Sequence, residues 1–256
     1  LYTLAYLAQQ RGRPEEAQAY ARRAASMPPD YCFPFRLEEM SILQQALVDN
    51  PEDSRAHCYL GHLLYDKKRF EEAMQHWEAA TRLEPHAAIA WRNLGLAYYN
   101  VRHDRAQARA CYEQALQANP NDPRLLSELD QLLKRQGEPA HSRLARLERR
   151  LDLVEQRDDL TVERATLFNQ LHEPEKALQI VASRRFHPWE GGEGRVSDQY
   201  ENAHMMLGRE ALEAARAEEA LAHFEQALAF PENLGEGRFP TTSLAHIHYW
   251  IGRAHE

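Results

Sequence analysis

The stretch of sequence that decides the fold runs from residue 60 to residue 85 and reads LGHLLYDKKRFEEAMQHWEAATRLEP. It recurs at residues 94–120, which read LGLAYYNVRHDRAQARACYEQALQANP. The alanine, aromatic, alanine and proline at positions 73, 77, 80 and 85 reappear 35 residues later, at 108, 112, 115 and 120, and the two Leu-Gly pairs are offset by 34. Self-similarity at a fixed period of this size is typical of a helical repeat protein.

The residue types in each copy suit two helices packed as a hairpin. Gly61 and Gly95 predict points where two helices cross closely, because a larger side chain would push the helices apart. The second helix supplies a small alanine and a large aromatic that interlock with this surface, a knob beside a hole. A proline then ends the second helix, since proline cannot continue it and restrains the residue before it.

This pattern resembles the tetratricopeptide repeat, and we interpret the chain as a member of that class of helical array. The resemblance implies an all-α fold, a right-handed superhelical solenoid of antiparallel helix hairpins. We expect a single array over residues 1–256, which is divided as follows: degenerate repeats at 1–53, two well-formed repeats at 54–122, irregular helices at 123–157, and degenerate repeats at 158–256.

Two further features of the sequence depart from a regular array: the packing position at Asp130 and the two ends of the sequence. Asp130 stands where the close-packing glycine should be, so we expect the packing there to deviate. The chain begins with Leu1 and not with methionine, and the residues around Gly252 begin a first helix without a partner. Because half a repeat cannot bury its own apolar face, we expect either that the sequence is a piece of a longer protein or that a short cap follows it.

Composition narrows the class of function. The formal net charge is −8, so nonspecific nucleic-acid binding has no electrostatic support. A basic stretch from Lys134 to Arg150 is interrupted by glutamates, and we interpret it as a solvated helix face. No apolar run is long enough to predict a membrane span. The three cysteines form no close pair, which fits a reducing, cytoplasmic compartment.

Motifs for catalysis or cofactors are not found. His246 and His248 are two residues apart, whereas a zinc-binding pair on a helix needs a spacing of four. Neither a G-x-S-x-G nucleophile elbow nor a dinucleotide-binding glycine motif occurs. We therefore predict no metal, no cofactor and no enzymatic activity for this chain.

The inward-facing positions of the first helices predict a binding groove. Counted along the two well-formed copies, these candidates are Arg55, Tyr59, His62, Tyr65, Arg92, Asn93 and Tyr99. Such side chains suit an extended peptide, whose backbone and carboxylates they can grip. Alternatively, the same surface packs on another domain of its own parent chain.

A subclass of tetratricopeptide proteins binds chaperone tails through a carboxylate clamp of Lys, Asn and Arg. Here Asn93 fits one clamp position, but Cys58 stands where the first lysine should be and Glu128 opposes the third site. The resemblance therefore does not predict capture of a chaperone tail.

Two long connections, at residues 185–195 and 231–240, both contain Gly-Glu-Gly-Arg. One interpretation is that they meet in a polar, aromatic-lined patch, in which Trp189 or Phe239 stacks on a flat ligand or a sugar ring. The ligand candidates in this patch are Trp189, Glu190, Glu193, Arg195, Glu232, Asn233 and Glu236. The other interpretation is that both loops are shaped corners with solvated glutamates.

The strings FHPWEGGEG (186–194) and PENLGEG (231–237), with DQLLKR (130–135) and DDLTVE (158–163) upstream, support a second resemblance. They are similar to the helical C-terminal part of a bacterial family of uncharacterised function labelled DUF5107. In that family a β-sandwich domain, similar to carbohydrate-active sandwiches, precedes the helical array. The resemblance implies a carbohydrate-related setting, with any catalytic domain outside this chain.

Two hypotheses about function follow. The first is a protein-interaction or scaffolding module that binds a peptide or a partner domain, and that also forms homo-oligomers if its surface is self-complementary. The second is an accessory lobe of a carbohydrate-active enzyme, whose glycine- and glutamate-rich loops complete a sugar site. The first predicts that substitutions in the groove abolish binding, and the second that substitutions in the loops reduce activity.

Overall fold

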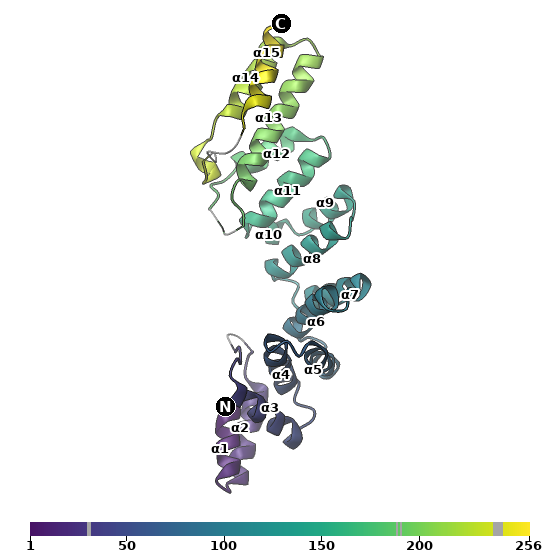
Figure 1. Cartoon of the computed structure of the whole chain (residues 1–256), viewed down its shortest axis with the longest axis vertical. Helices are drawn as coiled ribbons and strands as arrows, with labels where there is room; N and C mark the ends of the chain where they lie inside the picture. Colours follow the sequence, from purple (N-terminus) through teal and green to yellow (C-terminus); the bar gives the residue numbers. More distant parts are fainter. Residues whose placement is uncertain (30–31, 188, 190, 238–242) are drawn as a thin grey trace. The chain divides into compact units, whose positions relative to one another are not determined.

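The computed structural model describes residues 1–29, 32–187, 189, 191–237 and 243–256, and the described residues form helices and connecting loops without a strand. Contacts divide the chain into unit 1 (Leu1–Leu129) and unit 2 (Asp130–Glu256). In each unit, successive helices run antiparallel and are joined mostly by short turns, as Figure 1 shows. The predicted all-α fold built from helix hairpins is confirmed.

The described residues of unit 1 form three helix hairpins, the single helix α3 and the first half of a helix that continues into unit 2. Its helices are α1 (Tyr2–Gln10), α2 (Pro14–Ser26), α3 (Leu37–Asp49), α4 (Ser54–Asp66), α5 (Phe70–Leu83), α6 (Ala88–Asn100), α7 (Arg105–Ala118) and the first half of α8 (Pro123–Arg135). The side chains of Asp53 and Asp104 begin α4 and α7, because each accepts a hydrogen bond of 2.9 Å from a backbone N–H of the first turn.

Unit 2 starts within α8 and repeats the hairpin pattern with longer connections. Its other helices are α9 (Ala140–Glu148), α10 (Leu151–Val154), α11 (Asp158–Gln170), α12 (Pro174–Ala182), α13 (Arg195–Glu213), α14 (Ala217–Leu228), the 3-10 turn η1 (Glu232–Leu234) and α15 (Ala245–His255).

The turn inside each hairpin has a recurring backbone conformation. Lys68, His103, His172 and Ala215 have positive φ angles of 61°, 53°, 60° and 58°, and Gly12 and Gly137 have positive φ angles at the equivalent turns. Each lies seven or eight residues after the close-packing position of its first helix. Asp130 and Gly137 keep this spacing, so α8 and α9 form a repeat hairpin in register with the others.

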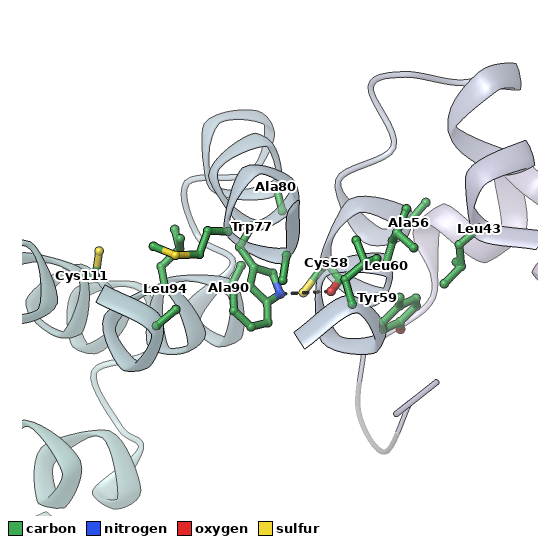
Figure 2. Close-up of a cluster of buried hydrophobic side chains, with 14 residues drawn as sticks. Leu43, Ala56, Cys58, Tyr59, Leu60, Trp77, Ala80, Ala90, Leu94 and Cys111 are labelled. Carbon is green, nitrogen blue, oxygen red and sulfur yellow. Dashed lines mark hydrogen bonds between the residues drawn. The ribbon is translucent and has the colours of Figure 1, made fainter. Parts of the chain in front are cut away.

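The core of each well-formed repeat is a glycine covered by an aromatic ring. A Cβ atom built on Gly61 would lie 2.5 Å from Nε1 of Trp77, and on Gly95 it would lie 2.7 Å from Cδ2 of Tyr112. On Gly208 it would lie 2.4 Å from Cε1 of Phe224. Figure 2 shows the Trp77 ring within the buried cluster of unit 1, beside Cys58 and Ala90. The predicted knob-and-hole packing is therefore present in both units.

Gly252 of α15 occupies the same register but meets no neighbour within 4 Å of a built Cβ. We expect Gly61→Ala to destabilise unit 1 by about 1–3 kcal/mol, because the new methyl group overlaps the buried indole. Gly252→Ala should instead stabilise α15 by up to about 1 kcal/mol, because alanine favours helix more than glycine does. Urea unfolding of both variants measures these changes, and a loss of stability at Gly252 equal to that at Gly61 would contradict the packing explanation.

At the α8–α9 hairpin, a buried ion cluster replaces the glycine–aromatic contact. Arg143 on α9 donates from Nε and Nη2 to the Asp130 carboxylate at 3.0 and 2.5 Å, and Nη2 also donates to Glu163 Oε1 at 2.7 Å. The side chains of Arg143, Asp130 and Glu163 are only 3%, 0% and 1% exposed. The predicted deviation in packing at Asp130 thus takes the form of a fully enclosed charge network.

The interpretation of the basic stretch as a solvated face is wrong for Arg143. Its charge points inward because the carboxylates of α8 and α11 lie beneath α9. Lys134 is exposed and also donates to Glu163, at 2.8 Å. Burial alone would raise the pKa of Glu163, but these cations lower it below its ordinary value.

Candidate functional site

Unit 1 carries a groove of about 710 Å³ along the first helices of its repeats. It is lined by residues of α4, α5, α6, α8 and the segment 33–35: Phe33, Pro34, Phe35, His62, Asp66, Trp77, Ala88, Ile89, Arg92, Asn93, Asn119, Asp122, Arg124 and Leu125. We call this surface the unit 1 groove. Three of its residues, His62, Arg92 and Asn93, are among those predicted from the sequence.

A neutral histidine lies at the centre of the groove. The indole N–H of Trp77 donates to Nδ1 of His62 at 3.0 Å and to the carbonyl oxygen of Cys58 at 3.2 Å. Because an indole can only donate, Nδ1 of His62 must accept, and the ring proton lies on Nε2. Burial and the nearby charge of Arg92 lower the pKa of His62 to about 4. His62 therefore adds a polar but uncharged group to the groove.

The charge of Arg92 is already neutralised from within unit 1. Its guanidinium forms a bidentate pair with Glu128, with Nε–Oε2 and Nη2–Oε1 distances of 2.7 and 2.8 Å, and Arg124 donates to the same carboxylate at 2.9 Å. A ligand carboxylate would have to displace Glu128 to reach Arg92. This arrangement supports the expectation that the groove does not grip a carboxylate tail.

Part of the remaining lining is apolar and open to solvent, beside the polar residues Asp66, Asn119 and Asp122. Phe33 and Phe35 are 69% and 62% exposed, and Ile89 on α6 is 39% exposed. Large apolar side chains gathered at one groove mark a surface that gains free energy when a partner covers it. The sequence analysis missed Phe33 and Phe35 because they lie in an irregular segment where the repeat pattern gives no register.

The other predicted groove residues do not line this groove. Tyr59 is buried against the ring of Tyr2, so the expectation that it faces a ligand is corrected. Tyr65 packs against Trp77 and Phe70. Arg55 is turned toward Glu84, and Tyr99 lines a separate hollow with Asn100, His103 and Arg105. Four of the seven predicted side chains therefore stabilise the repeats or lie elsewhere on unit 1.

The two long loops of unit 2 do meet. The backbone N–H of Phe186 donates to the carbonyl oxygen of Asn233 at 2.8 Å, and the Asn233 side chain donates to the carbonyls of Val181 and Arg184 at 2.8 and 3.1 Å. The Phe186 ring is fully buried beneath the junction. Asn233 thus bonds the otherwise unpaired carbonyls around the end of α12.

Glu236 acts as the N-terminal cap of α13. One carboxylate oxygen accepts from the N–H of Gly194 at 2.8 Å, and the other accepts from the N–H groups of Val196 and Ser197 at 3.0 and 2.8 Å. A carboxylate at this place also complements the positive end of the helix dipole. Both oxygens are occupied by backbone donors, so Glu236 is a structural group here.

The other loop candidates are spread over different surroundings. The Trp189 ring covers the backbone of Gly192, whose built Cβ would lie 2.0 Å from the ring. Arg195 donates to the buried Glu163 at 2.8 Å. Glu193 and Glu232 are exposed, while Glu190 and Phe239 lie outside the described residues. These contacts agree with the interpretation of the loops as shaped corners.

Acid should destabilise both units, because burial lowers the pKa values of His62, His76 and His204 to about 4. In the unfolded chain these groups titrate near 6.5, so the unfolded state binds more protons between about pH 6.5 and 4. Stability is then complete above pH 6.5 and falls as the pH drops, by at most about 1.4 kcal/mol per pH unit for each histidine and by less where water screens the charge.

Urea unfolding at pH 7.5 and pH 5.5 measures this loss. His62→Gln should reduce the difference between the two pH values, while substitution of the exposed His103 should leave it unchanged. A His62→Gln protein with the full original difference would show that His62 does not contribute.

Comparisons with known proteins agree with this architecture. A family model described as TPR repeat matches residues 61–101, and two models described as Tetratricopeptide repeat match residues 41–76 and 1–31. The chain contains tetratricopeptide repeats. The crystal structure of YrrB, described as a TPR protein with an unusual peptide-binding site, superposes with a TM-score of 0.52 at 22% identity, over 73% of this chain and 90% of YrrB.

Two curated proteins are similar to parts of this chain. Type IV pilus assembly protein PilF of Pseudomonas aeruginosa is 30% identical over 149 residues, which cover 53% of this chain and 58% of PilF. Protein O-mannosyl-transferase TMTC1 of Mus musculus is 31% identical over 123 residues, which cover 46% of this chain and 12% of TMTC1. The chain thus matches little more than half of one relative and a small part of the other.

The described residues contain neither a membrane-spanning helix nor a cluster of side chains that could hold a metal ion. No helix among these residues is long and apolar enough to cross a membrane. No group of three or more of their His, Cys, Asp or Glu side chains is arranged to hold a metal ion.

Proposed function

We propose that this chain is a protein-interaction module whose unit 1 groove binds an extended peptide segment with large apolar side chains. The observation that carries the proposal is the exposure of Phe33, Phe35 and Ile89 along one groove whose central arginine is already paired. The partner's apolar side chains would cover these three residues. The amide of Asn93, which is near His62 Nδ1 at 3.3 Å, would bond its backbone.

The similarity of these repeats to other tetratricopeptide repeats supports a binding role in general. Tetratricopeptide arrays present elongated concave surfaces, and YrrB is described as having a peptide-binding site. The relation to DUF5107 and a cytoplasmic location stay predictions. Under this proposal the chain has no catalytic role of its own.

A displayed library of random peptides, selected on the purified chain, tests the proposal. We expect the selected peptides to be rich in aromatic and large aliphatic residues. In fluorescence anisotropy, Phe35→Ala and Ile89→Ala should each weaken binding by about tenfold, which corresponds to the loss of a well-packed apolar contact.

Val48→Ala is the matched control, because Val48 is 74% exposed yet lies outside the groove. Its affinity for the same peptides should equal that of the unmodified chain. Selection of polar peptides, or unchanged binding by both groove variants, would refute the proposed site.

A further inference from the structure

Unit 2 carries a second groove, which none of the sequence predictions covers. It has a volume of about 440 Å³ and lies on α11, α13 and α15. Its lining residues are Thr166, Asn169, Gln170, Gln199, Asn202, Met205, Met206, Arg209, His246 and Trp250. We call this surface the unit 2 groove. Its chemistry differs from that of the unit 1 groove, because carboxamides take the place of exposed aromatic rings.

The charge of the unit 2 groove opposes that of the whole chain. The chain has 39 acidic and 31 basic residues, yet none of the described residues that line this groove is acidic. Glu201 contacts the groove from outside the lining, because its Oε1 lies 2.9 Å from Nε2 of His246. The described lining residues themselves thus carry a positive charge, with one carboxylate beside them.

Arg209 is the source of that charge. Its guanidinium lies over the Trp250 ring, 5.1 Å from the ring centroid. Within the described part of the chain, Arg209 forms no ion pair. Stacking on an aromatic face holds a guanidinium in place without neutralising it, and its N–H groups keep the fork geometry that a carboxylate matches.

The carboxamides of the groove are partly organised already. Asn169 donates from Nδ2 to the backbone oxygen of Gln199 at 3.1 Å and to its side-chain oxygen at 3.2 Å. Since a backbone carbonyl can only accept, this contact fixes which way the Asn169 amide points. Gln199 accepts through its side-chain oxygen, which leaves its N–H₂ group as the donor for other partners.

The side-chain oxygen of Asn169 lacks a hydrogen-bond donor in the described part of the chain. The residue is 9% exposed, and its Oδ1 is buried. Buried acceptors without a donor are uncommon in folded proteins and call for an explanation. Because Oδ1 itself is enclosed, a backbone N–H of a bound segment would reach it only after the Asn169 side chain turns toward the groove.

We propose that the unit 2 groove binds an extended acidic peptide segment. Arg209 would take a carboxylate of that segment in a bidentate pair, while Gln199 and Asn202 would bond its main chain. Met205, Met206 and Trp250 supply an adaptable apolar floor, since methionine fills irregular gaps. This site is separate from the unit 1 groove and does not depend on the function proposed there.

Fluorescent short peptides test the proposal, with each Glu-containing sequence matched by the same sequence containing Gln. We expect the Glu peptides to bind the full chain at least about tenfold more tightly than their Gln counterparts, because a charge-assisted bidentate pair is lost. Arg209→Gln should abolish this preference, and Arg209→Lys should retain only part of it, since lysine lacks the planar fork.

Two controls separate this site from general effects. Arg216→Gln removes a cation of unit 2 that is paired with Glu219 outside the groove, and it should leave binding unchanged. Val48→Ala in unit 1, at an exposed position outside both grooves, should also have no effect on the preference for Glu. Circular dichroism of each variant confirms that the helices remain folded.

Three results would overturn the proposal. The first is equal affinity for the Glu and Gln peptides, and the second is an Arg209→Gln chain that keeps the preference for Glu. The third is tighter binding of a single-stranded oligonucleotide than of any acidic peptide, because it would assign the groove's positive charge to phosphate recognition.

Discussion

Replacing Arg143 by methionine should destabilise unit 2 by about 3–5 kcal/mol, because it leaves two buried carboxylates without their shared cation. Asp130 depends most on Arg143, since its carboxylate accepts both of the guanidinium contacts at 3.0 and 2.5 Å. Glu163 loses less, as Lys134 and Arg195 each still donate to it at 2.8 Å. Most of the loss should therefore arise from Asp130.

A double-mutant cycle tests this assignment. Asp130→Gly restores the residue that the repeat uses at this position, so Asp130→Gly combined with Arg143→Met should be more stable than Arg143→Met alone. Urea unfolding of the three variants gives the coupling free energy.

The matched control is Arg150→Met, which removes a cation from an exposed pair with Asp152. It should change stability by no more than about 1 kcal/mol. If Arg143→Met costs no more than Arg150→Met, the buried cluster does not stabilise unit 2.

Sequence reasoning found the hairpins because their determinants are local. Leu-Gly, an aromatic sixteen or seventeen residues later and a closing proline together require two helices that cross at the glycine. The structure places Trp77 on Gly61 and Tyr112 on Gly95 as this requires. Asp130 was also recognised as an exception, since it interrupts an otherwise regular register.

The charge cluster could not be derived in the same way. Arg143 and Glu163 are separated by twenty residues and lie on α9 and α11, so their contact depends on how two hairpins stack. In sequence, Arg143 is one of many basic residues interspersed with glutamates. Such a pattern usually indicates a solvent-exposed helix face. Only the packing of the helices distinguishes the buried Arg143 from its exposed neighbours.

Some residues of the two grooves could be predicted from the sequence and others could not. His62 follows the packing glycine by one residue, and Arg92 and Asn93 precede theirs by three and two, which is why counting along the well-formed copies found them. The same count in unit 2 reaches Arg209, one residue after Gly208. The signal for Arg209 is therefore present in the sequence, in the register of the packing glycine, and not in the two loops.

The loops illustrate the opposite error. Their glycines, glutamates and aromatics suggested a ligand patch, but the same residue types also suit tight corners. Glu236 has both carboxylate oxygens on backbone donors at the start of α13. Residue composition alone does not distinguish a carboxylate that binds a ligand from one that caps a helix.

Trp77→Ala should destabilise unit 1 by about 3–5 kcal/mol, since it empties the largest fully buried site of the core. The indole fills the space above Gly61, and Figure 2 shows its N–H directed at the carbonyl of Cys58. Alanine would leave a cavity at this crossing and would remove the indole bond to that carbonyl, which keeps its bond within α4.

Trp77→Phe separates the two contributions. Phe224 fills the equivalent place in unit 2, so a phenyl ring fits this register, and the loss should be limited to about 1–2 kcal/mol. Trp91→Ala is the control for indole removal in general. Trp91 is half-buried at the surface of the same cluster, so its loss should cost clearly less than that of Trp77. Urea unfolding of the three variants measures these differences.

The Trp77 variants also test whether this core residue supports peptide binding in the unit 1 groove. The indole N–H of Trp77 holds Nδ1 of His62 as an acceptor, and both residues line the unit 1 groove. Trp77→Phe keeps the ring but releases His62, so peptide binding should weaken although the repeat stays folded. If Trp77→Phe binds peptides as tightly as the unmodified chain, the groove does not need the fixed His62 ring, and its affinity must come from the exposed wall of Phe33, Phe35 and Ile89.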